Sequence, residues 1–241
     1  MAKIRKSTRT NRVETGRGTE LLENPEAITE SFSKTEDFIK TNRTLVFSIG
    51  GLIALAIAGV FIYKMYMNNQ NKEAQLEMYQ AVYYFESDSL SRALNGDGNN
   101  YGFLEIVDRY GRTEAGNLAR FYIAVSYLKL GEFENAIDYL NDFSSSDLLI
   151  QARAYALIGD ANMELNNFSE AAKYYERAAD HRSNKFFSPQ YLMKAAISYE
   201  KLNDFNKAIQ VYDRILENYH DTDEVQDARK HKARLEGLAA K

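Results

Sequence analysis

Gly131-Glu-Phe133-Glu-Asn-Ala136 is the stretch that decides the fold, because its pattern returns twice further along the chain. The two echoes are Asn166-Asn-Phe168-Ser-Glu-Ala171 and Asn203-Asp-Phe205-Asn-Lys-Ala208, whose phenylalanines follow Phe133 at steps of 35 and 37 residues. A small residue stands nine positions before each phenylalanine: Ala124, Gly159 and Ala196. A large apolar residue stands seven positions after it: Leu140, Tyr175 and Tyr212. This period predicts stacked pairs of antiparallel helices that cross closely at the small residues.

Over about residues 101–236 these offsets resemble the tetratricopeptide-repeat family, including Tyr127 and Tyr199 at the tyrosine position of the first helix. The chain departs from that pattern in having no tryptophan and in carrying Asn162 where the middle unit would have the tyrosine. The resemblance implies an α-solenoid that binds other polypeptides.

A second self-match extends the array towards the N-terminus. Five residues recur at an offset of 109: Ile106, Tyr110, Thr113, Ala119 and Arg120 match Ile215, Tyr219, Thr222, Ala228 and Arg229. We therefore expect residues 101–110 to be the second helix of a degenerate first unit, whose first helix follows the apolar segment described next. Residues 222–238 should form a capping helix, so the repeat domain is predicted over residues 101–241.

Leu45 to Tyr63 is a run of nineteen residues without a charged side chain. As a helix it would be about 28 Å long, close to the thickness of a bilayer core. A buried soluble helix would keep a polar stripe, and the apolar residues continue beyond the cleavage-like Ala56-Ile57-Ala58, which argues against a removed signal peptide. We predict an uncleaved signal anchor over residues 45–63, with Gly50, Ala54 and Ala58 forming a face for helix packing.

Charge predicts the orientation of this anchor. Residues 1–43 carry nine Lys and Arg, whereas Lys64 and Lys72 alone fall in the twenty residues after it, so the N-terminus should be cytoplasmic. Residues 1–44 are predicted to be a largely disordered basic and polar cytoplasmic tail. The C-terminal bulk would then lie outside the cytoplasm.

Residues 64–100 link the anchor to the repeats. Leu76, Tyr79, Val82, Tyr83 and Leu90 are spaced for an amphipathic helix over residues 71–94. Turn-forming residues 95–100 then predict a loop. With two prolines and no cysteine in the whole chain, we expect an all-α protein without disulfides.

Catalytic chemistry is not indicated. The histidines, His181, His220 and His231, have no spacing typical of a metal site, and the loop around Asp97 has a tyrosine where a calcium loop needs an oxygen ligand. No phosphate-binding or nucleophile motif occurs, and the acidic repeat domain disfavours nucleic acid. We predict a protein that is not an enzyme and uses no cofactor or metal.

Binding is predicted on the concave face formed by the first helices of the repeats. By the family's offsets this peptide-binding face contains mostly apolar residues: Phe121, Val125, Arg153, Asp160, Met163, Met193 and Ile197. The alternative is that the helix after the membrane covers this face as part of the core.

The order of cytosolic tail, single anchor and exported repeats resembles the YfgM-like ancillary subunits of the bacterial SecYEG translocon, from Phe38 through the anchor to Asn100-Tyr101-Gly102 and the repeats beyond. The resemblance implies a bacterial inner membrane with the repeat domain in the periplasm. It also implies translocon subunits, periplasmic chaperones and nascent exported chains as partners, and an adaptor or chaperone-like role. The alternative is a structural scaffold for cell-envelope or outer-membrane assembly. An enzyme or metal-dependent regulator is the third class, and no catalytic constellation supports it.

Overall fold

The computed structural model describes residues 38–239, and within that range the chain forms helices and no strand. This confirms the predicted all-α fold. The helices are α3 (Arg43–Glu86), α4 (Leu90–Asn95), α5 (Phe103–Tyr110), α6 (Glu114–Leu130), α7 (Phe133–Asn141), α8 (Leu148–Glu164), α9 (Phe168–Asp180), α10 (Ser188–Lys201), α11 (Phe205–Asn218) and α12 (Glu224–Ala239). The predictions for residues 1–37 lie outside the described residues.

The chain divides into two compact units, which meet between Lys64 and Met65 within α3. In the first unit, α3 is long and apolar enough to cross a membrane by length and composition, and its apolar window is 0% buried. A side chain added at Gly50, Gly51 or Gly59 would meet no atom within 4 Å. The small-residue face around Gly50 therefore packs against nothing among the described residues.

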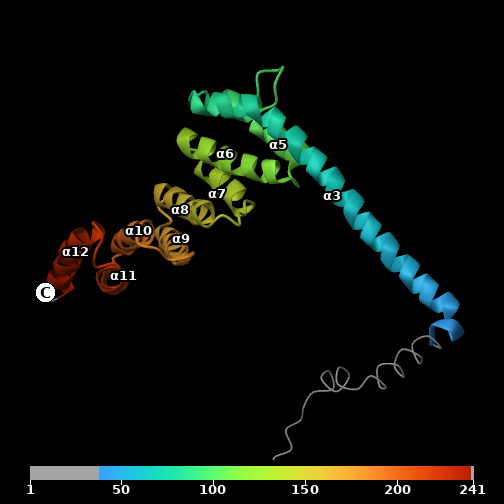
Figure 1. The fold of residues 1–241 in the computed structure, drawn as a ribbon. Helices are drawn as coiled ribbons and strands as arrows, with labels where there is room; N and C mark the ends of the chain where they lie inside the picture. Colours follow the sequence, from blue (N-terminus) through green and yellow to red (C-terminus); the bar gives the residue numbers. More distant parts are fainter. Residues whose placement is uncertain (1–37, 240–241) are drawn as a thin grey trace, which may run out of the picture. The chain divides into compact units, whose positions relative to one another are not determined.

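In the second unit the helices from α5 to α12 stack in the order of the sequence (Figure 1). The stack is built on a turn that occurs four times. The turn places one residue in the left-handed region: Asp88 (φ 57°), Gly131 (φ 80°), Asn166 (φ 60°) and Asn203 (φ 58°). The next residue then donates its backbone N–H to the carbonyl five positions back, as in Glu132 to Tyr127 at 2.9 Å. This hydrogen bond ends each first helix and reverses the chain into the second.

The turn at Asp88 reveals a repeat unit at an unexpected position. Ser89 donates to the carbonyl of Tyr84 at 2.8 Å, which interrupts the helix predicted over residues 71–94. Leu90 takes the place of the phenylalanine, and Ala81 and Ala93 stand at the usual offsets of −9 and +3. Both alanines are completely buried. The C-terminal part of α3 thus precedes the turn as a first helix, and the helix that follows the turn begins at Leu90 rather than at residue 101.

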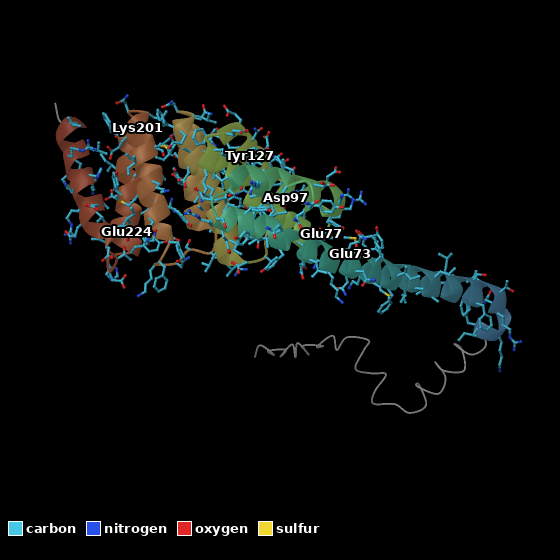
Figure 2. The ribbon with its side chains drawn as sticks, turned by 90° about the horizontal axis from the view of Figure 1, so that it is seen from above. Glu73, Glu77, Asp97, Tyr127, Lys201 and Glu224 are labelled. Carbon is cyan, nitrogen blue, oxygen red and sulfur yellow. The ribbon has the colours of Figure 1, made fainter. Side chains whose placement is uncertain are left out.

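A loop over residues 96–102 splits that second helix into α4 and α5. Leu90 is equivalent to Phe205 at an offset of 115 residues, and Ile106 is equivalent to Ile215 at an offset of 109. The offset falls by six across the loop, so the loop adds six residues to this unit. Asp97, labelled in Figure 2, accepts hydrogen bonds from the Tyr84 hydroxyl at 2.6 Å and from the backbone N–H groups of Asn99 and Asn100. These donors hold the pKa of the Asp97 carboxyl well below its ordinary value. The carboxylate therefore closes the loop.

The two helices of each repeat touch at the small residues. Ala124 and Ala196 are completely buried. At Gly159 a Cβ atom would lie 2.7 Å from the ring of Tyr175. That ring is itself fixed, because the Tyr175 hydroxyl donates to Asp160 at 2.7 Å. Tyr212, at the equivalent position of the last repeat, donates to Glu200 at 2.7 Å. Each of these tyrosines therefore bonds back to the first helix of its own repeat.

Glu200 also joins the capping helix to the stack. It accepts a hydrogen bond from Arg234 of α12, and His231 of α12 lies 3.0 Å from the same carboxylate. Burial alone would raise the pKa of Glu200, but hydrogen bonds from Tyr212, His231 and Arg234 outweigh it and lower the pKa. The contribution of Glu200 to stability is therefore present above its pKa in the unfolded chain and is lost as the pH falls through its lower folded value.

We predict that Gly159→Ala lowers the free energy of unfolding by about 1–3 kcal/mol, because the new methyl group must displace the packed Tyr175 ring. Gly237→Ala in α12 is the matched control, since a Cβ there meets nothing within 4 Å. It should raise helix stability by about 0.5–1 kcal/mol. Urea denaturation of the full chain in detergent measures both variants. Equal stability of the two variants would contradict a close helix crossing at Gly159.

Candidate functional site

An apolar hollow on the repeats lies between the first helices α6, α8 and α10. It has a volume of about 510 Å³. Its lining is apolar apart from a few polar side chains, and includes Leu118, Phe121, Leu149, Ile150, Phe187 and Tyr191. Leu149 is 53% exposed and Phe187 is 40% exposed, so solvent reaches the apolar wall directly.

Local hydrogen bonds place these apolar side chains at the helix starts. Asp147 accepts from the backbone N–H groups of Leu149 and Ile150 at 2.9 and 3.0 Å, which caps α8 and holds both residues in its first turn. In the turn before α10, Asn184 accepts from the N–H groups of Phe186 and Phe187, both at 3.0 Å. The chain therefore fixes exposed apolar residues in place instead of burying them.

A second hollow of about 410 Å³ continues this surface between α3 and α6. Met78, Tyr79 and Val82 of α3 line it, and it shares Leu118 and Tyr122 with the first hollow. We call the two together the apolar groove. No residue of α3 lines the hollow between α6, α8 and α10. The helix after the apolar segment therefore forms a wall at one end of the groove and does not cover the rest.

The seven residues predicted for the binding face do not form one site. Phe121 and Arg153 line the apolar groove. A separate hollow of about 260 Å³ is lined by three others, Asp160, Met163 and Ile197. Val125 and Met193 are half-buried against the hydrophobic core. Whether any of the seven contacts a partner stays a prediction.

Asp160 already has partners within the chain. Lys194 of α10 donates to it at 2.6 Å, and the Tyr175 hydroxyl donates to the same oxygen. Burial, together with the charge of Asp160, raises the pKa of Tyr175 far above its ordinary value. Asp160 thus links three helices, and a ligand would have to compete with these bonds to reach it.

Sequence reasoning missed the residues that give the groove its apolar character. Leu149, Ile150 and Phe187 lie at or just before a helix start, outside the offsets used to choose the binding face. Their signal in the sequence was the run Leu148-Leu149-Ile150 after three serines and Asp147, and the pair Phe186-Phe187 in a polar connection. Apolar clusters beside loops are candidates for a binding surface when core packing does not need them.

No group of three or more His, Cys, Asp or Glu residues within residues 38–239 is placed to hold a metal ion. His231 lies against Glu200, and the His181 ring packs edge-on against Tyr155. Within residues 38–239, two of the three histidines therefore make contacts between helices.

A family model described as "Tetratricopeptide repeat" matches residues 123–186 and, in overlap, residues 156–221. Residues 123–221 therefore contain tetratricopeptide repeats. Among solved structures, a crystal structure from Podosopora anserina, described as "putative kinesin light chain nearly identical TPR-like repeats", is similar with a TM-score of 0.53 and 11% sequence identity. The similarity covers 70% of this chain and 88% of the other and concerns the fold alone. No curated protein matches the chain. Tetratricopeptide repeats are protein-interaction scaffolds, so the matched repeats form a protein–protein interaction module.

We predict that Leu149→Ala changes the free energy of unfolding by less than about 0.5 kcal/mol, because its side chain is half-exposed in the groove. Ile158→Ala, on the same helix but 1% exposed, should cost about 2–4 kcal/mol. Chemical denaturation of the full chain compares the two. A cost for Leu149→Ala as large as that for Ile158→Ala would assign Leu149 to the core.

Proposed function

We propose that the chain is a single-pass, membrane-anchored adaptor that holds a polypeptide segment in the apolar groove, as an accessory of the bacterial Sec translocon. The observation that carries this proposal is the exposed apolar lining of the groove, with the backbone of Leu149 and Phe187 held by hydrogen bonds to Asp147 and Asn184. Fixed apolar side chains that stay in contact with water gain free energy when a partner covers them.

The anchor is proposed from residues 45–63, which carry no charge and whose side chains are exposed except for the half-buried Val46. A helix with such a surface is stable in a bilayer, where apolar side chains meet lipid. The excess of Lys and Arg before this segment favours a cytoplasmic N-terminus and a periplasmic repeat domain.

The role at the translocon is proposed from the resemblance to YfgM-like subunits, which share the order of tail, anchor and exported repeats. A groove for apolar segments suits this role, because exported chains emerge unfolded with their apolar residues exposed. Scaffolding of envelope or outer-membrane assembly would use the same groove for a different protein, so partner identity separates the two roles.

We expect a photo-crosslinking amino acid at Leu149 to capture translocon subunits, periplasmic chaperones or nascent exported chains in intact membranes. Glu134 on α7 is the matched control position, because it is exposed but lies outside the groove. Mass spectrometry of the crosslinked products identifies the partners. Recovery of envelope-assembly proteins instead would favour the scaffold role. Equal yields of the same products from both positions would contradict binding in the groove.

Topology can be tested separately, because the chain has no cysteine and a single introduced one is a unique label. A membrane-impermeant maleimide added to spheroplasts should label Ser146→Cys, in the loop before α8. It should leave Ser7→Cys unlabelled until the membrane is permeabilised. The reverse pattern would place the repeats in the cytoplasm, and labelling of both positions would exclude a membrane barrier between them.

A further inference from the structure

One basic side chain stands in the wall of the apolar groove. Arg153, on α8, is the only charged residue lining the hollow between α6, α8 and α10. Residues 1–43 carry nine basic and seven acidic residues, which is a formal charge of +2. Because the whole chain has a formal charge of −4, the chain beyond residue 43 has a formal charge of −6. A lone cation on the apolar lining of an acidic domain is therefore not a consequence of the overall composition.

Arg153 differs from its basic neighbours in lacking an acidic partner. Lys194 pairs with Asp160 at 2.6 Å, and Arg214 pairs with Asp180 at 2.6 Å. Within the part of the chain that the structure describes, no carboxylate lies within 4.0 Å of the Arg153 side chain. The guanidinium hydrogen-bonds the Tyr191 side chain: burial raises the pKa of the phenol, and the positive charge and hydrogen bond of Arg153 partly offset the increase. Because a guanidinium carries five N–H donors, the donors that do not face Tyr191 are available to a partner.

The surroundings of Arg153 would strengthen a bond to a carboxylate. An ion pair gains strength as apolar groups displace water, and an occupant of the groove would displace water from around Leu149, Ile150 and Phe187. A guanidinium can also donate two parallel hydrogen bonds to one carboxylate, which fixes the direction of the partner as well as its charge.

The shape of the groove decides where that carboxylate comes from. From Arg153 the apolar lining continues past Leu118 and Tyr122 into the hollow between α3 and α6. A bound segment can therefore run past Arg153 in the direction of α3, and its terminus need not lie at the guanidinium. Capture of a chain terminus would need several donors converging on one point, and Arg153 is the single cation of its hollow. An acidic side chain within the segment fits this arrangement.

We propose that the occupant of the apolar groove is an apolar polypeptide segment with an internal Asp or Glu, whose carboxylate pairs with Arg153. This inference rests on the proposed function, because it specifies the partner of the same groove. Apolar contacts would supply most of the affinity, and the ion pair would set the register of the segment. Segments without an acid would bind, but more weakly and without a fixed register.

The test uses the full chain in detergent and two dye-labelled probes, a twelve-residue Leu/Ala peptide with one central Glu and the same peptide with Gln. Both are amidated at the C-terminus, and fluorescence anisotropy gives each Kd. The Glu peptide should bind about fivefold more tightly than the Gln peptide, the upper end for a partly exposed ion pair. The preference should shrink as salt is added.

Arg153→Gln should abolish the preference and leave the affinity for the Gln peptide unchanged. Arg229→Gln is the matched control, because Arg229 is an exposed arginine of α12 outside the groove, and it should keep the preference. A version of the Gln peptide with a free C-terminal carboxylate should bind no more tightly than its amide.

The failures of the two proposals are distinguishable. Equal binding of the Glu and Gln peptides, or a preference that survives Arg153→Gln, would overturn the role of Arg153 and leave groove binding intact. Tighter binding of the free C-terminal acid than of any amidated peptide would overturn the internal carboxylate in favour of a chain terminus. Binding of neither peptide would contradict the proposed function and this inference together.

Discussion

The close crossing of two helices at a small buried residue is the contact on which the rest of the structure depends. Ala81, Ala124, Gly159 and Ala196 occupy the crossing in successive repeats. Because each crossing holds its two helices in the same relation, the first helices α3, α6, α8 and α10 all contribute to one side of the stack. Their outward apolar residues then form a groove that no single repeat could provide.

The sequence predicted three repeats because their local requirements are strict. A left-handed residue must precede the second helix by two positions, and Gly131, Asn166 and Asn203 are residue types that tolerate this conformation. The start of the second helix in the first unit was not predicted from the sequence, for two reasons. Leu90 replaces the phenylalanine, and the loop after α4 adds six residues, which moves the remaining matches out of step. Both changes preserve packing, since Ala81 and Ala93 are still completely buried.

The candidate site was harder to predict than the fold, because it depends on contacts between repeats. Phe121 and Arg153 were found from the offsets of the tetratricopeptide-repeat family, applied to the first helices. Asp160 was placed on the binding face by the same offsets, yet Lys194, 34 residues later on the next first helix, pairs with it. Leu149 and Phe187 reach the groove because Asp147 and Asn184 accept hydrogen bonds from the backbone beside them, which those offsets do not reveal.

The C-terminal part of α3 belongs to the repeat stack and forms one wall of its groove. Hydrogen–deuterium exchange of the full chain in detergent is the sharpest test of this packing, because contact with α5 and α6 should slow exchange in α3 beyond what an isolated helix allows. The buried contacts are Ala74, Met78 and Ala81. Amides of residues 74–86 should therefore exchange as slowly as those of α6. Much faster exchange in this segment than in α6 would show that it does not pack on the stack.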